Sequence, residues 1–369
     1  MPAKKRKPTI CYITGDWSWG TEPLQPNGCA WYRCKLPMDE LGKRGWITGM
    51  GFPGFSKDKG FGLIVQEGQV IHGWDIVVMK LLMQREVLEG MDYAESLGQK
   101  VVVDVDDWYE GLPESNRAFK VTDAKNNPDN NREIYAEIIR RAFAITVSTP
   151  FLYDYYSSKR KNVYLVRNGI DISIPGRWTN VPRNSAKHRM TIGWVGATDW
   201  RSHDLEQIAP WLSNYMGKNK LHFHHSGHTQ SSPNACDLLQ ISKKHFKSCG
   251  LTPILSYPQL FRHFDIGIVP LNDIPFNHAK SFIKGLEYAA AGIPFVSSYS
   301  PEYQYLADCG IGKVAKSDSE WQEHLDALLD PRTRVYEKEK NKEILSSFSM
   351  QVRGLDWDMA FRSILEQTW

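Results

Sequence analysis

The feature that most constrains the fold is an alternation of short, unbroken apolar runs with longer stretches of helical periodicity. Residues 75–79 and 100–105 are such runs, and residues 132–142 carry a helical pattern. Unbroken apolar runs of this length are typical of strands that are buried on both faces of a parallel sheet. Strands that alternate with helices predict βαβ units. Further strands are expected at residues 8–14, 144–148 and 163–166, and a helix at residues 32–45 with Leu36, Met38 and Leu41 as buried positions.

The alternation restarts after a polar stretch at residues 181–187, where we place a linker. Roughly 100–200 residues per domain leaves room for two domains. We therefore predict an α/β protein of two Rossmann-like, doubly wound domains, residues 1–180 and 181–350, facing a central cleft. A helix within residues 351–369 is expected to pack back on the first domain. Strands are predicted at residues 191–195, 221–225, 266–270 and 294–298, and helices at 205–215, 281–291, 318–329 and 356–367.

Composition narrows the class of protein. The net charge of +3 is too mild for the concentrated basic face of a DNA-binding domain, and the basic run at residues 4–7 is expected to be a solvated tail. The six cysteines form no Cys-x-x-Cys pair, so reduced thiols are expected. No signal-peptide apolar region starts the chain, and no apolar run approaches the ~18 residues of a membrane span. These features predict a cytoplasmic protein.

A predicted helix in the second half carries the most informative polar pattern. Ser281 is expected to cap its N-terminus. Lys280, Lys284 and Glu287 fall at i, i+4 and i+7, so they share one face. Backbone N–H groups, the helix dipole and lysines at a helix start suit an anionic ligand such as a phosphate. Spacing alone favours a simpler interpretation, an exposed helix with a weak ion pair between Lys284 and Glu287.

The segment around this helix resembles the donor-binding signature of GT-B glycosyltransferases of the family 4 type. It reads Phe-Asn-x-x-Lys-Ser-x-x-Lys-x-Leu-Glu-Tyr-Ala-Ala-Ala-Gly-Ile-Pro at residues 276–294. Motifs at residues 147–152, 166–171, 192–196 and 257–270 resemble the same family and follow its order. An ordered set of motifs is far more specific than any one of them. The resemblance implies a GT-B fold and a sugar donor that is a UDP-sugar or a GDP-sugar.

The resemblance also implies residue roles. The signature has two glutamates eight positions apart, and the second matches Glu287, which implies contact with the donor ribose. The first falls at Ala279, whose side chain cannot bind a sugar, so Lys280 or Asn277 is expected to substitute. A basic pair for the diphosphate is implied, with Arg201 as one member and Lys280 as the other. The implied donor-binding residues of the second half are therefore Gly196, Arg201, His225, Asn277, Lys280, Ser281 and Glu287.

An acidic run, Asp104-Val105-Asp106-Asp107, ends a predicted strand of the first half. Three interpretations stay open. The carboxylates could bind sugar hydroxyls, as the position of a His-Asp pair in the resembled family implies; they could hold a divalent cation; or they could cap the following turn. Asp106 and Asp107 lie furthest past the strand. With Arg201 and Lys280 they are the candidate catalytic residues.

The first loop, residues 15–33, contains Asn27-Gly28 directly before a predicted helix. This loop resembles the one that lies beside the donor phosphates in GT-B enzymes. Gly28 has no Cβ and allows a ligand to approach the backbone, so it completes the predicted donor-binding set. A plain surface loop with a turn at Asn27-Gly28 is the alternative.

Four histidines, His222, His224, His225 and His228, raise the possibility of zinc. No Cys or carboxylate stands near them at ligand spacing, so we predict no metal site. A serine-hydrolase mechanism is excluded as well, since no Gly-x-Ser-x-Gly motif occurs.

These observations predict a glycosyltransferase that moves a sugar from a nucleoside diphosphate to an acceptor, with retention of anomeric configuration and without a required metal. A nucleotide-sugar epimerase and a non-catalytic sugar- or nucleic-acid-binding protein are the alternatives. The acceptor is open among a glycan, a virion protein and a modified DNA base, because parts of the first half resemble bacteriophage transferases. Such an enzyme would act in the host cytoplasm. The sequence does not predict an oligomeric state.

Overall fold

The computed structural model describes residues 6–18, 20–65, 68–178, 189–201, 203–230 and 232–368. The chain divides into two compact units, residues 1–112, 119–169 and 350–369 in the first, and 113–118 and 170–349 in the second. The division falls at Gly169, eleven residues before the predicted boundary, because the next residue already joins the second unit: the Ile170 N–H donates to the carbonyl of Phe348 at 2.9 Å. The linker predicted at residues 181–187 lies outside the described residues.

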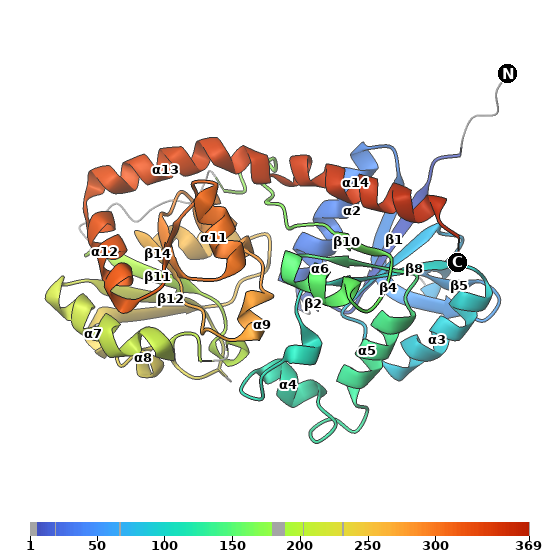
Figure 1. Ribbon diagram of the computed structural model, residues 1–369, viewed down its shortest axis with the longest axis horizontal. Helices are drawn as coiled ribbons and strands as arrows, with labels where there is room; N and C mark the ends of the chain where they lie inside the picture. The colour runs from blue at the N-terminus through green and yellow to red at the C-terminus, as the bar shows by residue number, and fades with distance from the viewer. Residues whose placement is uncertain are drawn as a thin grey trace. The chain divides into compact units, whose positions relative to one another are not determined.

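The first unit is built on an eight-stranded sheet with the order β10-β9-β8-β7-β1-β4-β5-β6 (Figure 1). From β1 the chain builds the sheet outward in both directions, with β4 on one side and β7 on the other. Such a reversal is the topological switch point at which doubly wound folds bind ligands. The parallel strands are β1 (Thr9–Thr14), β4 (Ile47–Ser56), β7 (Ile76–Lys80), β8 (Lys100–Val105), β9 (Ala144–Val147) and β10 (Val163–Leu165).

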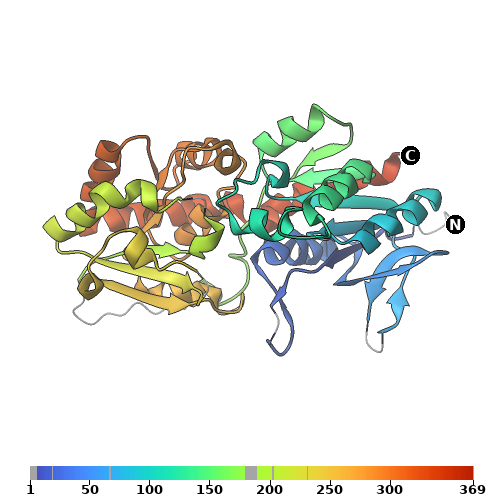
Figure 2. The same cartoon turned by 90° about the horizontal axis from the view of Figure 1, so that it is seen from below.

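An antiparallel ribbon extends this sheet and was not predicted. The far half of β4 pairs with β5 (Gly60–Ile64), which pairs with β6 (Val70–Ile71). In Figure 2 this light-blue ribbon leaves the layer of parallel strands. Glycine permits the close pairing, since a Cβ at Gly62 would lie 2.2 Å from the Ile71 carbonyl oxygen. A second, two-stranded hairpin pairs β2 (Trp17–Ser18) with β3 (Gln25–Pro26).

The first helix differs from its prediction. It begins at Gly28, four residues early, and runs without a break through α1 (Gly28–Ala30), a π-helical turn (Trp31–Lys35) and α2 (Leu36–Lys43). Met38 is only half-buried. The other helices that contribute to this unit are α3 (Arg85–Ser96), a 3-10 turn (Tyr109–Gly111), α4 (Arg117–Thr122), α5 (Asn131–Arg141) and α6 (Pro150–Ser157).

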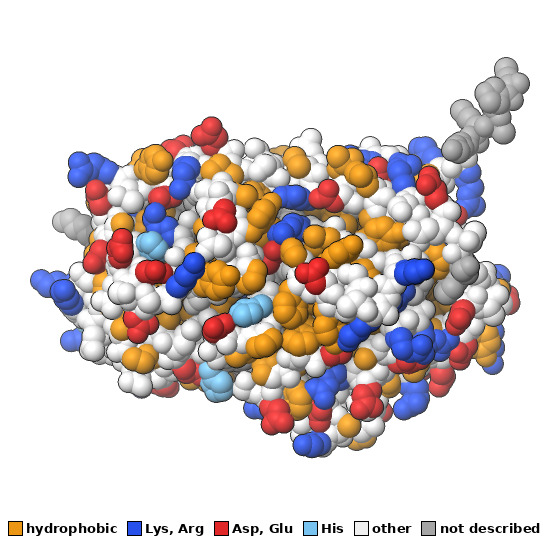
Figure 3. Space-filling view, in the orientation of Figure 1, with side chains coloured by type: hydrophobic (Ala, Val, Ile, Leu, Met, Phe, Trp, Pro, Cys, Tyr) orange, Lys and Arg blue, Asp and Glu red, His pale blue; other side chains and the backbone are white. Residues whose placement is uncertain are grey.

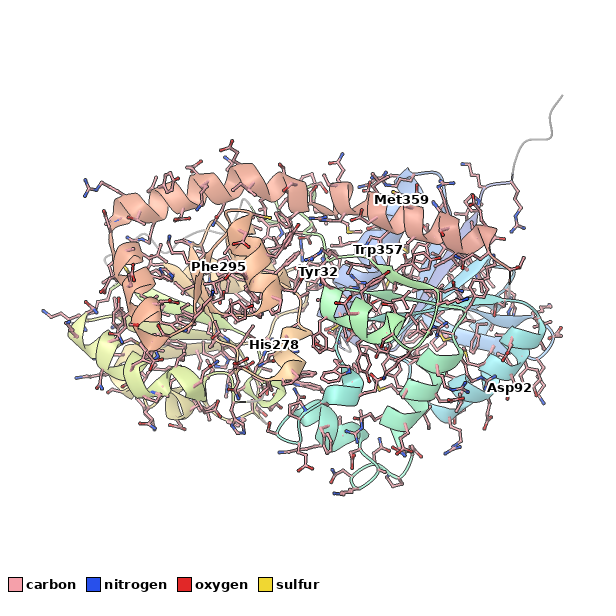
Figure 4. All side chains as sticks on the ribbon, in the orientation of Figure 1. Tyr32, Asp92, His278, Phe295, Trp357 and Met359 are labelled. Carbon is pink, nitrogen blue, oxygen red and sulfur yellow. The ribbon has the colours of Figure 1, made fainter. Side chains whose placement is uncertain are left out.

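The C-terminal helix α14 (Met350–Glu366) belongs to the first unit and starts six residues before the predicted position. It packs on α2, where a Cβ at Gly354 would meet Glu40. Trp357 is fully buried and Met359 is 62% exposed, and Figure 4 labels them on opposite sides of the helix. The helix thus covers α2 and closes the apolar core of the first unit.

The second unit contains a six-stranded parallel sheet with the order β13-β12-β11-β14-β15-β16. Its switch point lies between β11 and β14, the first and fourth strands of this unit along the chain. Trp194, Leu212, Phe223, Ile268 and Leu325 lie in its main core. The strands are β11 (Thr191–Val195), β12 (His222–His228), β13 (Phe246–Gly250), β14 (Ile266–Val269), β15 (Phe295–Ser298) and β16 (Lys313–Ala315).

The predicted helix at residues 281–291 is shorter than expected. It is α10 (Ile283–Ala290), whose N-cap is Phe282 and which has no side-chain cap, so Ser281 lies before the cap rather than at it. The predicted helix at 205–215 begins as a 3-10 turn (Glu206–Ile208) and continues as α7 (Ala209–Lys218). The others are α8 (Ala235–Leu238), α9 (Pro275–His278), α11 (Pro301–Asp308), α12 (Asp318–Leu329) and α13 (Pro331–Leu345), with 3-10 turns at Thr198–Trp200, Lys243–His245, Tyr257–His263 and Ser346–Phe348.

Candidate functional site

Closely packed backbone lies beside the switch point of the second sheet. Gly196 directly follows β11 with φ +149°, a conformation that favours glycine, and its N–H donates to the Ser226 carbonyl at 2.9 Å. A Cβ at Gly227, one residue before the end of the neighbouring strand β12, would lie 3.1 Å from the Gly196 oxygen. The two glycines therefore bring the ends of β11 and β12 together and leave backbone, without side chains, at this point.

The buried ring of His225 holds this backbone in place through a hydrogen bond. Its ring is fully buried, and Nε2 lies 2.7 Å from the Gly196 carbonyl oxygen. Burial lowers the pKa of His225 to about 4, so the ring is neutral and donates this bond at neutral pH. The structure thus places His225 behind Gly196, where it positions the backbone and is not itself a surface group.

Three basic side chains gather beside this backbone. Arg201 follows the 3-10 turn after Gly196, and its buried Nε has no hydrogen-bond partner among the described residues. Burial, opposed by Glu287 and reinforced by Arg201, lowers the pKa of Lys284 to about 8. Lys280 adds to the same lowering, and its ammonium lies 4.3 Å from the centre of the Phe276 ring. Burial is the main cause of this lowered pKa, and a bound anion would favour the charged form of the lysine.

Glu287 places a buried carboxylate among these cations, and a neighbouring side chain holds it. It is 4% exposed, and the Tyr257 hydroxyl donates to its Oε2 at 2.8 Å. The Lys284 ammonium lies 3.8 Å from the same oxygen. Tyr257 comes from the 3-10 turn before β14, and Glu287 from α10. One carboxylate oxygen is therefore fixed, which orients the other.

Asn277 and Ser281 occupy the segment that leads into α10. Asn277 is 1% exposed and donates to Asp204 Oδ1 at 2.7 Å and to the Asn272 carbonyl at 2.9 Å. Ala279, in the place of the first glutamate of the resembled signature, is fully buried. Ser281 is half-buried before the helix begins. Asn277 thus ties this segment to Asp204, and its contact with a sugar remains a prediction.

The acidic run of the first unit lies at the switch point of the first sheet. Asp104 is fully buried, bound by Arg33 Nη2 at 2.7 Å and by Lys80 Nζ at 3.1 Å. Asp106 is 15% exposed, and its Oδ1 lies 2.5 Å from the same ammonium. Asp107 is half-buried. Since lysine and arginine already neutralise two of the three carboxylates, the cation interpretation of this run loses its physical basis, whereas contact with hydroxyls does not.

Gly28 is the first residue of α1 and does not lie ahead of the helix as predicted, and its surroundings do not suit a phosphate. The Asp16 carboxylate, after β1, accepts the Ala30 N–H in the first turn of that helix at 2.8 Å. Burial raises the pKa of Asp16, and the Asp106 charge adds to the rise. A Cβ at Gly28 would meet nothing within 4 Å. A carboxylate in the helix-start position argues against the phosphate contact predicted for Gly28.

The four histidines do not converge. His224 stacks on His263 with ring centres 4.3 Å apart, His222 faces His245, and His225 holds Gly196. Among the described residues no group of three or more His, Cys, Asp or Glu side chains is arranged to hold a metal.

No helix in the described part of the chain is both long and apolar enough to span a membrane. On the face drawn in Figure 3, basic and acidic side chains are interspersed.

Several residues at these two switch points were not predicted from the sequence. Lys80, the last residue of β7, reads as the polar end of an apolar run, and only the sheet order brings it to Asp106. Asp16 follows Gly15 after β1 and gives no motif. Tyr257 lies 30 positions before its partner Glu287. None of these pairs has a local spacing signal.

Comparison with known proteins supports the fold. No protein-family model matches the chain. A curated relative, TuaH of Bacillus subtilis, named as a glycosyltransferase of teichuronic acid biosynthesis, is 22% identical over 284 residues. The match covers 73% of this chain and 66% of the relative, just under two thirds of its length.

Solved structures match over nearly the whole chain. A sucrose-phosphate synthase of Thermosynechococcus elongatus gives a TM-score of 0.63 at 13% identity over 97% of this chain and 99% of that one. A glycosyltransferase of Rickettsia africae gives 0.63 at 12% identity over 99% and 100%. Anabaena HepE in complex with UDP gives 0.60 at 12% identity over 97% and 100%. These structures show a GT-B fold with two Rossmann-like domains.

Proposed function

We propose that the chain transfers a sugar from a nucleoside diphosphate sugar to a hydroxyl acceptor, with retention of anomeric configuration. The observation that carries this proposal is the second switch point, where Gly196 backbone, three cations and one oriented carboxylate come together. A nucleoside diphosphate presents the complementary groups, a polyanion and a ribose diol. The relative named for glycosyl transfer and the neighbour solved with UDP support the same ligand.

The donor would be held by the second unit. Arg201, Lys280 and Lys284 would bind the diphosphate, assisted by the Gly196 backbone and the uncapped start of α10. Glu287 would accept hydrogen bonds from the ribose diol through Oε1, since Tyr257 and Lys284 hold Oε2. Ala279 leaves the sugar-contacting position of the signature empty, so the sugar would be bound by neighbours such as Asn277 and by groups of the first unit.

The reaction breaks the bond between the anomeric carbon and the diphosphate oxygen and forms one from that carbon to the acceptor oxygen. The acceptor proton leaves with the nucleoside diphosphate, on whose oxygens the negative charge develops. Stabilising that charge is the main catalytic task, and Arg201 and Lys280 would perform it without a metal ion. Asp106 and Asp107 would bind hydroxyls of the transferred sugar and the acceptor.

A glycan is the acceptor we favour, because the curated relative is named as a glycosyltransferase of teichuronic acid biosynthesis. A virion protein and a modified DNA base belong to the less supported idea that the chain comes from a bacteriophage. Membership of family 4 rests on the signature at residues 276–294. A cytoplasmic location fits the six cysteines, none of which is in a disulfide.

A panel of UDP-glucose, UDP-N-acetylglucosamine and GDP-mannose tests the proposal. At least one should raise the melting temperature and release its nucleoside diphosphate. Glu287→Ala should abolish the thermal shift, while the control Glu323→Ala, at an exposed glutamate of α12, should not. Conversion of the donor into its epimer without release would indicate an epimerase. No thermal shift with any donor would refute the proposal.

A further inference from the structure

A chain of four charged side chains runs through the interior of the first unit. Arg33 binds Asp104 with two hydrogen bonds, Nε–Oδ1 at 3.0 Å and Nη2–Oδ2 at 2.7 Å. Lys80 binds Asp104 Oδ1 at 3.1 Å and Asp106 Oδ1 at 2.5 Å. The first three side chains are at most 1% exposed, and Asp106, the outer member, is 15% exposed.

Stability does not explain this chain of charges. Removing ions from water is costly, and replacing a buried ion pair by packed apolar residues is often neutral or stabilising. The surrounding strand positions are apolar: Val77 to Met79 on β7 and Val101 to Val103 on β8 are all buried. An apolar pair at Lys80 and Asp104 would suit such a core. The charges therefore require another reason.

The inner end of this row of charged side chains, at Arg33 and Asp104, is held by several further contacts. Arg33 also donates to the Val166 carbonyl at 2.7 Å and to Asn168 Oδ1 at 3.0 Å, and its guanidinium lies 4.5 Å from the ring centre of Trp357. Thr146 donates its hydroxyl to Asp104 Oδ2 at 2.7 Å. With these contacts the Asp104 carboxylate is fixed, and through it the ammonium of Lys80.

The outer end lies at the switch point. Asp106 uses Oδ1 for Lys80, and its carbonyl accepts the Ser148 hydroxyl at 3.3 Å, so the residue has a defined orientation. Burial alone would lower the pKa of Lys80, but Asp106 and Asp104 outweigh it and raise the pKa well above its ordinary value. The titratable groups that face Asp106 are Lys80, Asp16, Cys29, Tyr109 and Tyr135.

We propose that Lys80 is a positioning residue for the transfer reaction: held by Asp104 and Arg33, it fixes the Asp106 carboxylate and aims Oδ2 at a hydroxyl of the transferred sugar. The inference rests on the proposed function and adds a residue to it. Asp106 touches the sugar, whereas Lys80 acts only through Asp106. Lys80 is the cation that binds this carboxylate, so its loss leaves Asp106 beside Asp16 without that compensation.

Release of UDP or GDP from the active donor of the panel, with water as acceptor, measures the effect. Lys80→Met should lower kcat by about 10- to 100-fold while the affinity for free UDP or GDP changes less than about twofold. Lys80→Arg, which keeps the charge that binds Asp106, should keep more of the wild-type kcat than Lys80→Met does.

A double-mutant cycle separates positioning from folding. Asp106→Asn removes the group on which Lys80 acts, so adding Lys80→Met should lower kcat no further. Equal losses in both backgrounds would overturn the inference, as would an unchanged kcat in Lys80→Met. If Lys80→Met does not fold alone, the double variant decides: a double variant much slower than Asp106→Asn contradicts the inference. A wild-type protein that releases no nucleotide refutes the proposed function, whereas normal release with an indifferent Lys80 refutes only this inference.

Discussion

The two switch points occupy equivalent places in their sheets, but acidic side chains predominate at the first and basic side chains at the second. In the first unit, Lys80 forms ion pairs with Asp104 and Asp106, and Asp16 adds a further acid. In the second, Arg201 and Lys284 lie near the Glu287 carboxylate, and the pKa of Lys284 is lowered. Topology fixes where a ligand binds, and charge decides which ligand. The first point suits neutral hydroxyl groups, and the second suits a diphosphate.

Removal of Arg201 should have the largest effect. Arg201→Ala takes a cation from the position where leaving-group charge develops, so kcat should fall by about 100- to 1,000-fold. Nucleotide release from the active donor measures it. Arg332→Ala, at an arginine of the same unit that is 93% exposed, is the control and should be unaffected. A loss of less than about threefold in Arg201→Ala would mean that Arg201 lies away from the diphosphate.

Asp106→Asn should have the next largest effect, and of a different kind. The first switch point contacts sugar hydroxyls, so kcat should fall by about 100-fold while the Kd of free UDP or GDP changes by less than about twofold. Calorimetric titration of the nucleotide, beside turnover, gives both numbers. Weakened nucleotide binding in this variant would erase the distinction between the two points.

The depressed pKa of Lys284 predicts a pH effect of about tenfold. Its folded pKa of about 8 lies below the ordinary 10.5, so the ammonium loses its proton as the pH rises through about 8. A bound diphosphate favours the charged form, so nucleotide affinity should be constant below pH 8 and fall by up to about tenfold per unit above it. Titration of UDP or GDP between pH 7 and 9.5 shows the slope. In Lys284→Met the slope should disappear; if it persists, another group is responsible.

The same pKa shift gives a stability prediction. Between about pH 8 and 10.5 the unfolded chain binds the Lys284 proton and the folded protein does not, so this lysine makes stability rise with pH across that window. Denaturant unfolding of wild type and Lys284→Met at both ends of the window checks the sign. A wild-type gain that is no larger than that of Lys284→Met would contradict the assignment.

The smallest effects come from a pair of glycines. Gly28→Ala should leave nucleotide affinity unchanged, because a Cβ there meets nothing within 4 Å and Asp16 already occupies the helix start. Gly196→Ala should weaken it by several fold, because φ +149° strains any residue with a Cβ. Calorimetry on both variants compares them. If Gly28→Ala weakens the nucleotide more, the phosphate contact belongs to the first unit after all.

The sequence predicted the repeating core of the fold better than its additions. The strands β8 and β11 and the helix α12 have their predicted bounds, because an unbroken apolar run or a strong 3.6-residue period defines them locally. The antiparallel ribbon of β4, β5 and β6 was not predicted, because its strands are rich in glycine and one face shows no regular recurrence of apolar residues. The early start of the first helix was not predicted either, because the carboxylate that accepts the Ala30 N–H in its first turn belongs to Asp16, fourteen positions earlier in the chain.

The candidate site divides in the same way. A helical period predicts Lys284 and Glu287 on one face of α10, whereas Lys280 lies before the helix begins. The sequence did not predict that Asp104 points inward to Arg33 and Lys80 while Asp106 reaches the sheet edge. That arrangement depends on β7 lying beside β8, a long-range pairing that no local spacing encodes.

Hydrogen exchange of the full chain with and without saturating UDP or GDP, whichever raises the melting temperature, tests the central claim most directly. The donor diphosphate is assigned to the switch point of the second sheet. Amides in peptides that contain Gly196 and Lys284 should therefore gain protection on nucleotide binding, and those that contain Asp106 should change little. Protection confined to peptides around Gly28 and Asp106, with none near Gly196 or Lys284, would contradict the account.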